Sequence, residues 1–132
     1  MFEISVEETF AAGHALRNYR GKCENPHGHN YRVRITLRGP QLDSAGLLYD
    51  FCHLKQIIHN VTESVDHRYL NDQAPFDAIN PSAENIAKYF YEELSKQMRG
   101  GPEGQANGAS IARVDVWETD TTCATYWPGE RS

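Results

Sequence analysis

Hydrophobic and polar residues alternate along three segments of this chain: FEISVE at residues 2–7, YRVRITLR at residues 31–38 and IARVDVWE at residues 111–118. Alternation with a period of two is typical of a β-strand that buries one face. The segment GLLYDF, residues 46–51, follows a stretch rich in turn-forming residues and predicts a further short strand. The pattern therefore predicts four strands.

From Asp50 onward the apolar spacing changes from that of a strand to that of a helix. Asp50 can cap the first turn of one helix, and Ser82 can cap a second. Apolar residues then recur three or four positions apart in both segments, which predicts two amphipathic helices. The first stripe is Phe51, Leu54, Ile57, Ile58 and Val61, and the second is Ile86, Phe90, Leu94 and Met98.

The order of these elements favours an α+β fold, with one antiparallel four-stranded sheet and two helices packed on one of its faces. The length of 132 residues suits a single domain over residues 1–132. A small sheet that is covered on one side leaves open edges, and such edges are usually paired or covered. We therefore expect the chain to form a homo-oligomer.

Composition narrows the range of partners. The formal net charge is −5 and the pI is near 5.6, which argues against a general nucleic-acid binder, because such proteins need clustered positive charge. No apolar run approaches the roughly 18–20 residues that a membrane span needs, and the first residues do not have the pattern of a signal peptide. An anionic small molecule remains compatible, since a few local basic side chains suffice to bind it.

The three cysteines are an odd number in a chain without a secretion signal, which suggests reduced thiols in the cytoplasm. Cys52 lies in the first predicted helix and is expected to be a small buried residue. Cys23 lies next to Lys22 and four residues before His27. A thiol beside a bound metal can have a lowered pKa and act as a base or nucleophile, and a buried structural thiol is the alternative.

Three histidines form a candidate metal site. His27 and His29 flank Gly28, so in extended backbone both imidazoles project to the same side, in phase with Tyr31. His14, at the end of the first predicted strand, would lie alongside if that strand returns next to the second. Three imidazoles with an open fourth position are the ligand pattern of catalytic zinc. The alternative is that the HGH histidines are polar loop residues at the start of a strand.

Other ionisable residues offer less specific chemistry. Asp66 and His67 combine a carboxylate with an imidazole, a standard proton-transfer unit, but adjacent residues seldom bond each other directly and a capping role is the alternative. Glu118 shares a face with apolar residues of the last strand. Unless the strand turns outward there, this carboxylate needs a partner, such as the amidine-like edge of a ligand. His53 and His59 lie off the apolar stripe and are expected to be solvated.

The order and spacing of several motifs together resemble the 6-pyruvoyl-tetrahydropterin synthase and 6-carboxytetrahydropterin synthase family, which has the tunnelling fold. The motifs are FAAGHAL, GKCENPHGHNY, GLLYDFCHLK, DHRYLN, NPSAEN and WETDTTCATY, and they cover nearly the whole chain. The resemblance implies a zinc-dependent enzyme that oligomerises into a barrel, as a hexamer built from two trimers. It also implies 7,8-dihydroneopterin triphosphate as the substrate, without a redox cofactor.

The resemblance also assigns roles residue by residue. The family's zinc ligands and catalytic groups fall on His14, His27 and His29, on Cys23, and on the pair Asp66 and His67, which in the family reaches the site from a neighbouring subunit. The family's pterin contacts fall on Glu118 and on the stretch Ser82, Ala83 and Glu84, although most relatives carry a hydroxyl residue at the position of Ala83. Candidates for contacting the triphosphate, or alternatively solvated charges, are Lys22, Arg17 and Arg68.

Motif spacing indicates a subgroup. The short Cys-x-x-x-His-Gly-His spacing is similar to that of bacterial 6-carboxytetrahydropterin synthases, whereas animal-type pyruvoyl synthases have a longer spacing. The bacterial enzymes release acetaldehyde and triphosphate and supply the precursor of 7-deazaguanine nucleosides such as queuosine. The alternatives are a 6-pyruvoyl-tetrahydropterin synthase and a non-catalytic module that binds zinc or a pterin.

Glu24 raises the hypothesis of a second activity. A third subgroup replaces the cysteine with glutamate and cleaves the same substrate to 6-hydroxymethyl-dihydropterin for folate. The combination Cys-Glu-x-x-His-Gly-His, which here includes Cys23 and Glu24, resembles members that carry out both reactions. The alternative is that Glu24 is a solvent-facing turn residue.

Overall fold

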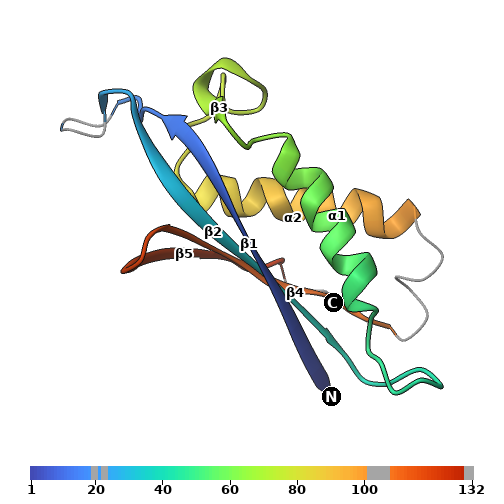
Figure 1. Cartoon of the computed structure of the whole chain (residues 1–132). Helices are drawn as coiled ribbons and strands as arrows, with labels where there is room; N and C mark the ends of the chain where they lie inside the picture. The colour runs from blue at the N-terminus through green and yellow to red at the C-terminus, as the bar shows by residue number, and fades with distance from the viewer. Residues whose placement is uncertain (19–20, 22–23, 101–107, 130–132) are drawn as a thin grey trace.

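The computed structural model describes all residues except 19–20, 22–23, 101–107 and 130–132. The side chains of residues 99 and 100 are also left undescribed. The elements follow one another along the chain as β1 (Phe2–His14), β2 (His27–Gly39), α1 (Phe51–Glu63), β3 (Arg68–Tyr69), a 3-10 turn η2 (Leu70–Asp72), α2 (Ala83–Gly100), β4 (Ser110–Thr119) and β5 (Thr122–Tyr126). Figure 1 shows a long twisted sheet with both helices on the same side of it.

The sheet has five strands in the order β3-β1-β2-β4-β5. Neighbouring strands are antiparallel except β3, which runs parallel to β1, so the predicted four-stranded antiparallel sheet is wrong and the sheet is mixed. The edge strands β3 and β5 were missed because one has only two residues and the other lacks a clean alternation of apolar and polar positions. The α+β class itself is confirmed.

The predicted strand at residues 46–51 is also wrong. The Asp43 carboxylate accepts hydrogen bonds from the backbone N–H groups of Ala45 and Leu47, which folds this segment into a turn. Leu48 and Tyr49 are buried against the core. The apolar run therefore belongs to a buried loop. A short apolar stretch looks the same in the sequence whether it forms a buried loop or a strand.

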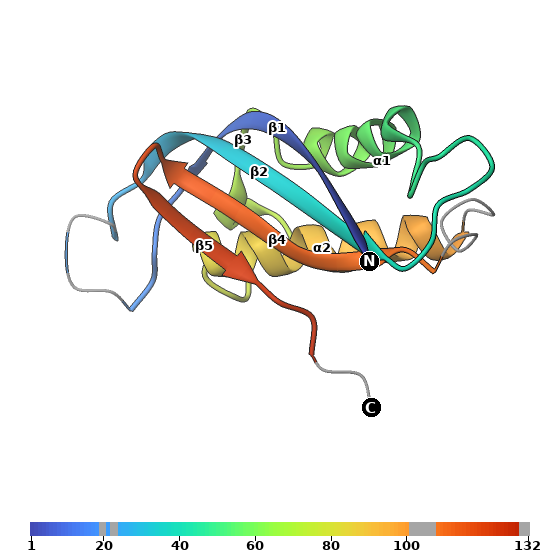
Figure 2. The ribbon, with the colours of Figure 1, turned by 90° about the horizontal axis from the view of Figure 1, so that it is seen from below.

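The two helices follow the sequence pattern closely. The Asp50 carboxylate accepts the backbone N–H of Cys52 at 2.9 Å, and the Ser82 hydroxyl accepts that of Asn85 at 3.2 Å, so both predicted caps are confirmed. Apart from Phe51, which is exposed, the predicted apolar stripes of both helices join the sheet in one core that includes Phe10, with α1 over β1 and α2 over β4 and β5. Figure 2 shows α2 running along this covered face. Within the described residues, no helix is long and apolar enough to cross a lipid bilayer.

Two expectations for α1 need correction. Cys52 is exposed rather than buried, and it borders a surface groove between α1 and β1. His53 is half-buried, with its ring 5.6 Å from that of Tyr49, and is not a fully solvated residue. His59 is exposed as expected, and its hydrogen bonds to the carboxylates of Glu8 and Glu63 raise its pKa above the ordinary value.

The sheet face opposite the helices carries an ion-pair cluster around Asp115. Its carboxylate lies 3.2 Å from the Arg34 Nε and 3.5 Å from the Arg113 Nε, and it accepts the hydroxyl of Thr125. Only 6% of this side chain is exposed, so water cannot replace these partners. The cluster therefore joins β2, β4 and β5 on the uncovered face.

We expect Asp115→Ala to lower the free energy of unfolding by about 1–3 kcal/mol, because it removes the acceptor of a hydroxyl and the buried carboxylate partner of two partly buried guanidinium groups. Urea denaturation monitored by circular dichroism measures this change. Glu7→Ala is the matched control, since Glu7 pairs with Arg32 and Arg34 from an exposed position and should cost less than about 1 kcal/mol. Equal effects of the two substitutions would contradict the special role of Asp115.

Candidate metal centre

The ends of two neighbouring strands bring three histidines together. β1 ends at His14 and β2 begins at His27, and these two residues are paired across the sheet. His29 projects from β2 on the same side as His27, as its spacing predicts. The ring centroids of His14 lie 4.6 Å from those of His27 and 5.1 Å from those of His29, and His27 and His29 are 4.8 Å apart.

The hydrogen bonds of the rings leave their Nε2 atoms facing one another. His14 Nδ1 lies 2.6 Å from the carbonyl oxygen of Pro81, and His27 Nδ1 lies 2.7 Å from that of Asn25. A carbonyl only accepts, so each Nδ1 carries a proton, and in the neutral form of each ring Nε2 carries a lone pair. These two Nε2 atoms are 3.1 Å apart. Two neutral acceptors at this distance do not stabilise each other, whereas a shared cation would.

His29 and Glu118 complete the cluster. His29 Nε2 is buried and makes no hydrogen bond within the part of the chain that the structure describes, although Glu118 Oε1 lies 3.1 Å away. One donor atom from each of His14, His27, His29 and Glu118 lies within 4.8 Å of the other three, so the group could hold a metal ion. Three imidazoles and a carboxylate suit zinc. The residues present therefore fit the metal that the sequence predicts.

Burial keeps the imidazoles in the form that binds metal. Desolvation lowers the pKa of His14, partly offset by its hydrogen bond to Pro81, and desolvation also lowers that of His29, partly offset by Glu118. Neutral imidazole is the ligand form, so protons compete less strongly for these two sites. Tyr31, whose hydroxyl lies 3.2 Å from His14 Nδ1, has a pKa raised by burial and stays protonated.

Asp66 and His67 lie at the edge of the sheet and do bond each other. His67 Nδ1 is 3.0 Å from an oxygen of Asp66, so the expectation that adjacent residues do not pair is wrong here. The reason is the backbone: His67 has a φ of 58°, and the backbone N–H of Ala11 donates to Asp66 at 2.9 Å. That hydrogen bond is the main cause of the lowered pKa of Asp66.

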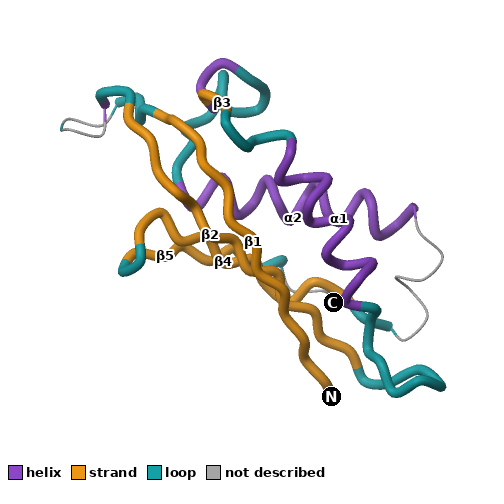
Figure 3. The backbone as a smooth tube through the Cα atoms, viewed as in Figure 1, coloured by secondary structure: helices purple, strands orange, loops and turns teal. Residues whose placement is uncertain are grey.

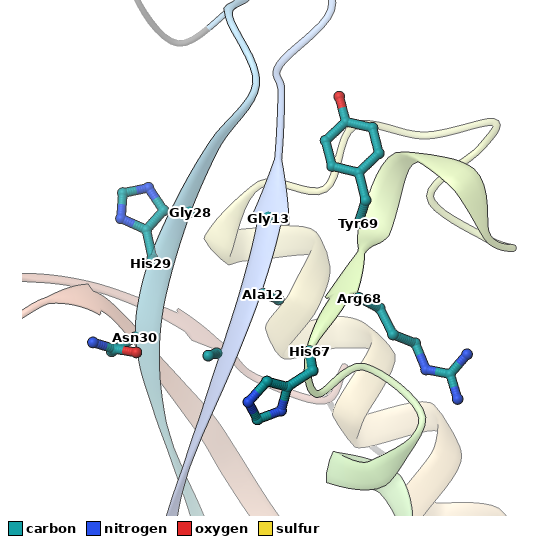
Figure 4. A pocket seen from close by; sticks show the side chains of 9 residues that line it. Ala12, Gly13, Gly28, His29, Asn30, His67, Arg68 and Tyr69 are labelled. Carbon is teal, nitrogen blue, oxygen red and sulfur yellow. The ribbon is translucent and has the colours of Figure 1, made fainter.

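The same chain does not bring His67 into the histidine cluster. Its side chain is 82% exposed, and Figure 4 shows His29 and His67 extending from opposite sides of the β1–β2 pair. An open hollow of about 470 Å³ lies between them, floored by Gly13 and Gly28, which face each other across the two strands. His67 is therefore available to a group outside this chain.

The remaining predicted residues occupy several environments. Cys23 and Lys22 lie outside the described residues. Glu24 is exposed, as is Glu84 in the first turn of α2, whereas Ser82 is half-buried as the cap of that helix. Figure 3 shows the loop before α2 returning toward the ends of β1 and β2, which agrees with the contact between Pro81 and His14.

Of the two basic candidates that the structure describes, Arg68 borders the hollow described above. The guanidinium of Arg17 donates instead to the carbonyl oxygens of Phe76 and Ile79, which makes it a bracing group for the loop before α2. Sequence reasoning missed the site's hydrogen-bond acceptors, the carbonyls of Asn25 and Pro81. The sequence carried no signal for these two carbonyls. It did indicate that Tyr31 lies on the same side of the strand as His27 and His29.

Comparisons with known proteins identify relatives of the whole chain. Residues 3–129 match the family model described as 6-pyruvoyl tetrahydropterin synthase. The 6-carboxy-5,6,7,8-tetrahydropterin synthase of Bacillus subtilis is 32% identical over 96% of this chain and 86% of the relative, and human 6-pyruvoyl tetrahydrobiopterin synthase is 29% identical over 94% and 90%.

The fold leads to the same proteins. The solved 6-pyruvoyl tetrahydropterin synthase of Caenorhabditis elegans superposes with a TM-score of 0.82 at 29% identity, covering 97% of this chain and 96% of that one. Relatives of both names lie at similar identity, so overall identity does not separate the two activities. The fold, the histidine cluster and these likenesses together show that the chain belongs to the 6-pyruvoyl tetrahydropterin synthase family of pterin-forming lyases.

Proposed function

We propose that this protein converts 7,8-dihydroneopterin triphosphate and one molecule of water to 6-carboxy-5,6,7,8-tetrahydropterin, acetaldehyde and triphosphate. The single observation that carries the proposal is the convergence of the Nε2 atoms of His14 and His27, 3.1 Å apart, with the buried Nε2 of His29 in the same cluster. The short spacing from Cys23 to the HGH motif supports the carboxy-forming branch over the pyruvoyl-forming one.

In this proposal His14, His27 and His29 hold zinc. Zinc bound there would act as a Lewis acid that polarises oxygen atoms of the substrate side chain and makes neighbouring C–H and O–H bonds more acidic. Glu118 is half-buried beside these ligands. It is therefore close enough to the metal to receive the donor edge of a pterin whose side chain reaches the zinc. Its carboxylate accepts two N–H bonds from that edge and fixes the orientation of the ring.

Proton transfer is assigned to Cys23 and to the pair Asp66 and His67. Cys23, as a thiolate, removes a proton from the substrate side chain. Asp66 is held in its ionised form by the backbone N–H of Ala11, and it bonds His67 Nδ1, so His67 keeps Nε2 free to exchange protons.

The exposure of His67 supports a site shared between subunits. A side chain that is 82% exposed, yet fixed by a carboxylate on one nitrogen, is placed to act on a partner chain. The edge of β1 supports the same assembly. The short strand β3 pairs only with Ala12 and Gly13, so among the described residues the part of β1 before Ala12 has no neighbouring strand on that side and can pair with another subunit. We therefore extend the proposal to a homo-oligomer whose sheets join in a barrel, as a hexamer of two trimers.

Mass spectrometry of the products tests the proposal directly. Zinc-loaded protein incubated with 7,8-dihydroneopterin triphosphate should yield 6-carboxytetrahydropterin and acetaldehyde, and Cys23→Ala protein should keep its zinc without forming either. A 6-pyruvoyl product would establish the alternative reaction of the family. Retention of zinc without turnover in the wild type would establish a binding module instead.

A second product, 6-hydroxymethyl-dihydropterin, is proposed on the position of Glu24. This carboxylate is exposed and lies next to Cys23, three residues before His27, and its backbone N–H bonds the carbonyl oxygen of Gly21. A carboxylate and a thiol so close along the chain can deprotonate different positions of one bound side chain.

We expect Glu24→Ala to lower formation of 6-hydroxymethyl-dihydropterin by about tenfold or more while leaving the carboxy product within about twofold, since one general base typically contributes at least this much. Both products are quantified in one reaction by mass spectrometry. Glu84→Ala is the comparison, because it removes another exposed carboxylate that is proposed to contact the pterin but not to transfer protons. It should leave the ratio of the two products unchanged. Absence of the hydroxymethyl product in wild-type reactions would refute this second activity.

A further inference from the structure

Two asparagine side chains continue the pairing of β1 beyond its end. β3 pairs in parallel with β1 only at Ala12 and Gly13. Farther along, the Asn71 amide accepts the backbone N–H of Ala15 and donates to its carbonyl oxygen, both at 2.8 Å. The Asn80 amide does the same for Arg17, at 2.7 and 2.8 Å. Each side chain thus takes the place of a neighbouring strand.

Few side chains can make this pair of bonds. A primary amide offers a donor and an acceptor in nearly the arrangement of a peptide group, so one residue satisfies both backbone groups of its partner. Aspartate has the same shape but only accepts when ionised, and serine is too short to do both. The use of asparagine at both Asn71 and Asn80 is therefore a specific solution, although the sequence analysis assigned neither residue to the site.

The residues whose backbone bonds Asn71 and Asn80 lie directly beside the metal centre. Ala15 and Arg17 follow His14 in the chain, and Pro81, whose carbonyl accepts the His14 ring at 2.6 Å, follows Asn80. The carbonyl of Asn80 in turn accepts the side chain of Asn85 at 2.9 Å, in the first turn of α2. The loop from Asn71 to Pro81 therefore holds both the backbone after His14 and the acceptor for its ring.

We propose that Asn71 and Asn80 are positioning residues of the metal centre. By fixing the backbone that follows His14, they keep its Nδ1 on the Pro81 carbonyl and its Nε2 directed at His27 before any metal binds. The inference rests on the zinc site of the proposed function, and it does not depend on which pterin reaction that site performs. Groups that orient a metal-binding histidine through its second ring nitrogen commonly change affinity by 10- to 100-fold when altered.

The test is zinc affinity in Asn71→Asp and Asn80→Asp proteins, measured by competition with a chromophoric chelator. Each aspartate keeps the acceptor and loses the donor, and zinc affinity should fall about 10- to 100-fold. The visible spectrum of the Co²⁺-substituted protein should change as well, because it reports ligand geometry. Asn60→Asp is the matched control: Asn60 donates one exposed bond to Gln97 on the helices, so affinity and spectrum should stay as in the wild type.

Comparison with a destabilised variant separates positioning from general stability. Thr62→Ala removes a buried hydroxyl that bonds Glu8, far along the chain from the metal centre, and should lower stability to urea without changing zinc affinity. Asn71→Ala and Asn80→Ala repeat the test without adding a charge. Asparagine variants that bind zinc as tightly as the wild type, or lose no more affinity than Thr62→Ala, would overturn the inference alone. A wild type that binds no zinc would overturn the proposed function with it.

Discussion

His29→Ala protein should fold normally and lose its metal. His29 supplies one of three nitrogen donors, and although its Nε2 is buried 3.1 Å from a Glu118 oxygen it makes no hydrogen bond among the described residues, so we expect its main contribution to be to metal binding. Catalytic zinc sites use three protein ligands. In the proposed function Glu118 serves the pterin, so His29→Ala leaves two imidazoles for the metal. We expect zinc content to fall from about one ion per chain to below about a tenth, and turnover of the pterin substrate to fall by about a thousandfold or more.

Elemental analysis after gel filtration measures the zinc content, and circular dichroism reports whether the fold is kept. The matched control is His59→Ala, because His59 is also a histidine with two carboxylate neighbours but lies on the surface of α1, with its side chain 52% exposed. It should retain zinc and activity. Full zinc occupancy in His29→Ala protein, or equal depletion in both variants, would show that the three histidines do not form the metal site.

The histidine cluster was predictable because strand geometry is a local property. Residues two apart in a strand share a face, so the HGH motif and Tyr31 had to lie on one side of β2. Only one long-range step was required, the return of β1 beside β2 that pairs His14 with His27. The same reasoning gave both helices and their caps, since the capping bonds of Asp50 and Ser82 span two or three residues.

Features that depend on contacts between distant segments were not predictable in this way. Asn71 bonds Ala15 across 56 residues, and nothing near Asn71 in the chain marks its amide as a substitute for a strand. The short strand β3 exists because it meets β1, rather than because Arg68 and Tyr69 favour extended structure. The direct bond between Asp66 and His67 likewise follows from a positive φ that the hydrogen bonds to Ala11 hold in place.

Subunit complementation should restore activity to two inactive variants. In His67→Ala protein the metal site is intact but the proton-transfer group is missing, and activity should fall by about 10²- to 10⁴-fold. In His29→Ala protein the metal is lost but His67 remains. If His67 serves the metal site of a neighbouring chain, a mixed oligomer contains sites that combine a complete metal centre from one subunit with His67 from the other.

The two variants are co-expressed with different tags, and only mixed oligomers are purified. With random assembly in equal amounts, a site has a one-half chance of a complete metal centre and a one-half chance of an intact neighbouring His67, so activity should recover to about a quarter of the wild type. The matched control mixes His29→Ala with Cys23→Ala, whose functions belong to the same half of the site. No subunit in this mixture then carries both an intact metal centre and Cys23, so activity should stay at the level of the separate variants.

Recovery in the first mixture and none in the control would follow from the position of His67 on the far side of the β1–β2 pair from His29 (Figure 4). Failure of both mixtures to recover would mean that His67 acts within its own chain or not at all, and the exposed Asp66–His67 pair would then need another explanation. Recovery in both would place Cys23 on the opposite half of the site from the metal. Recovery in either mixture therefore shows which catalytic groups lie on a different subunit from the metal.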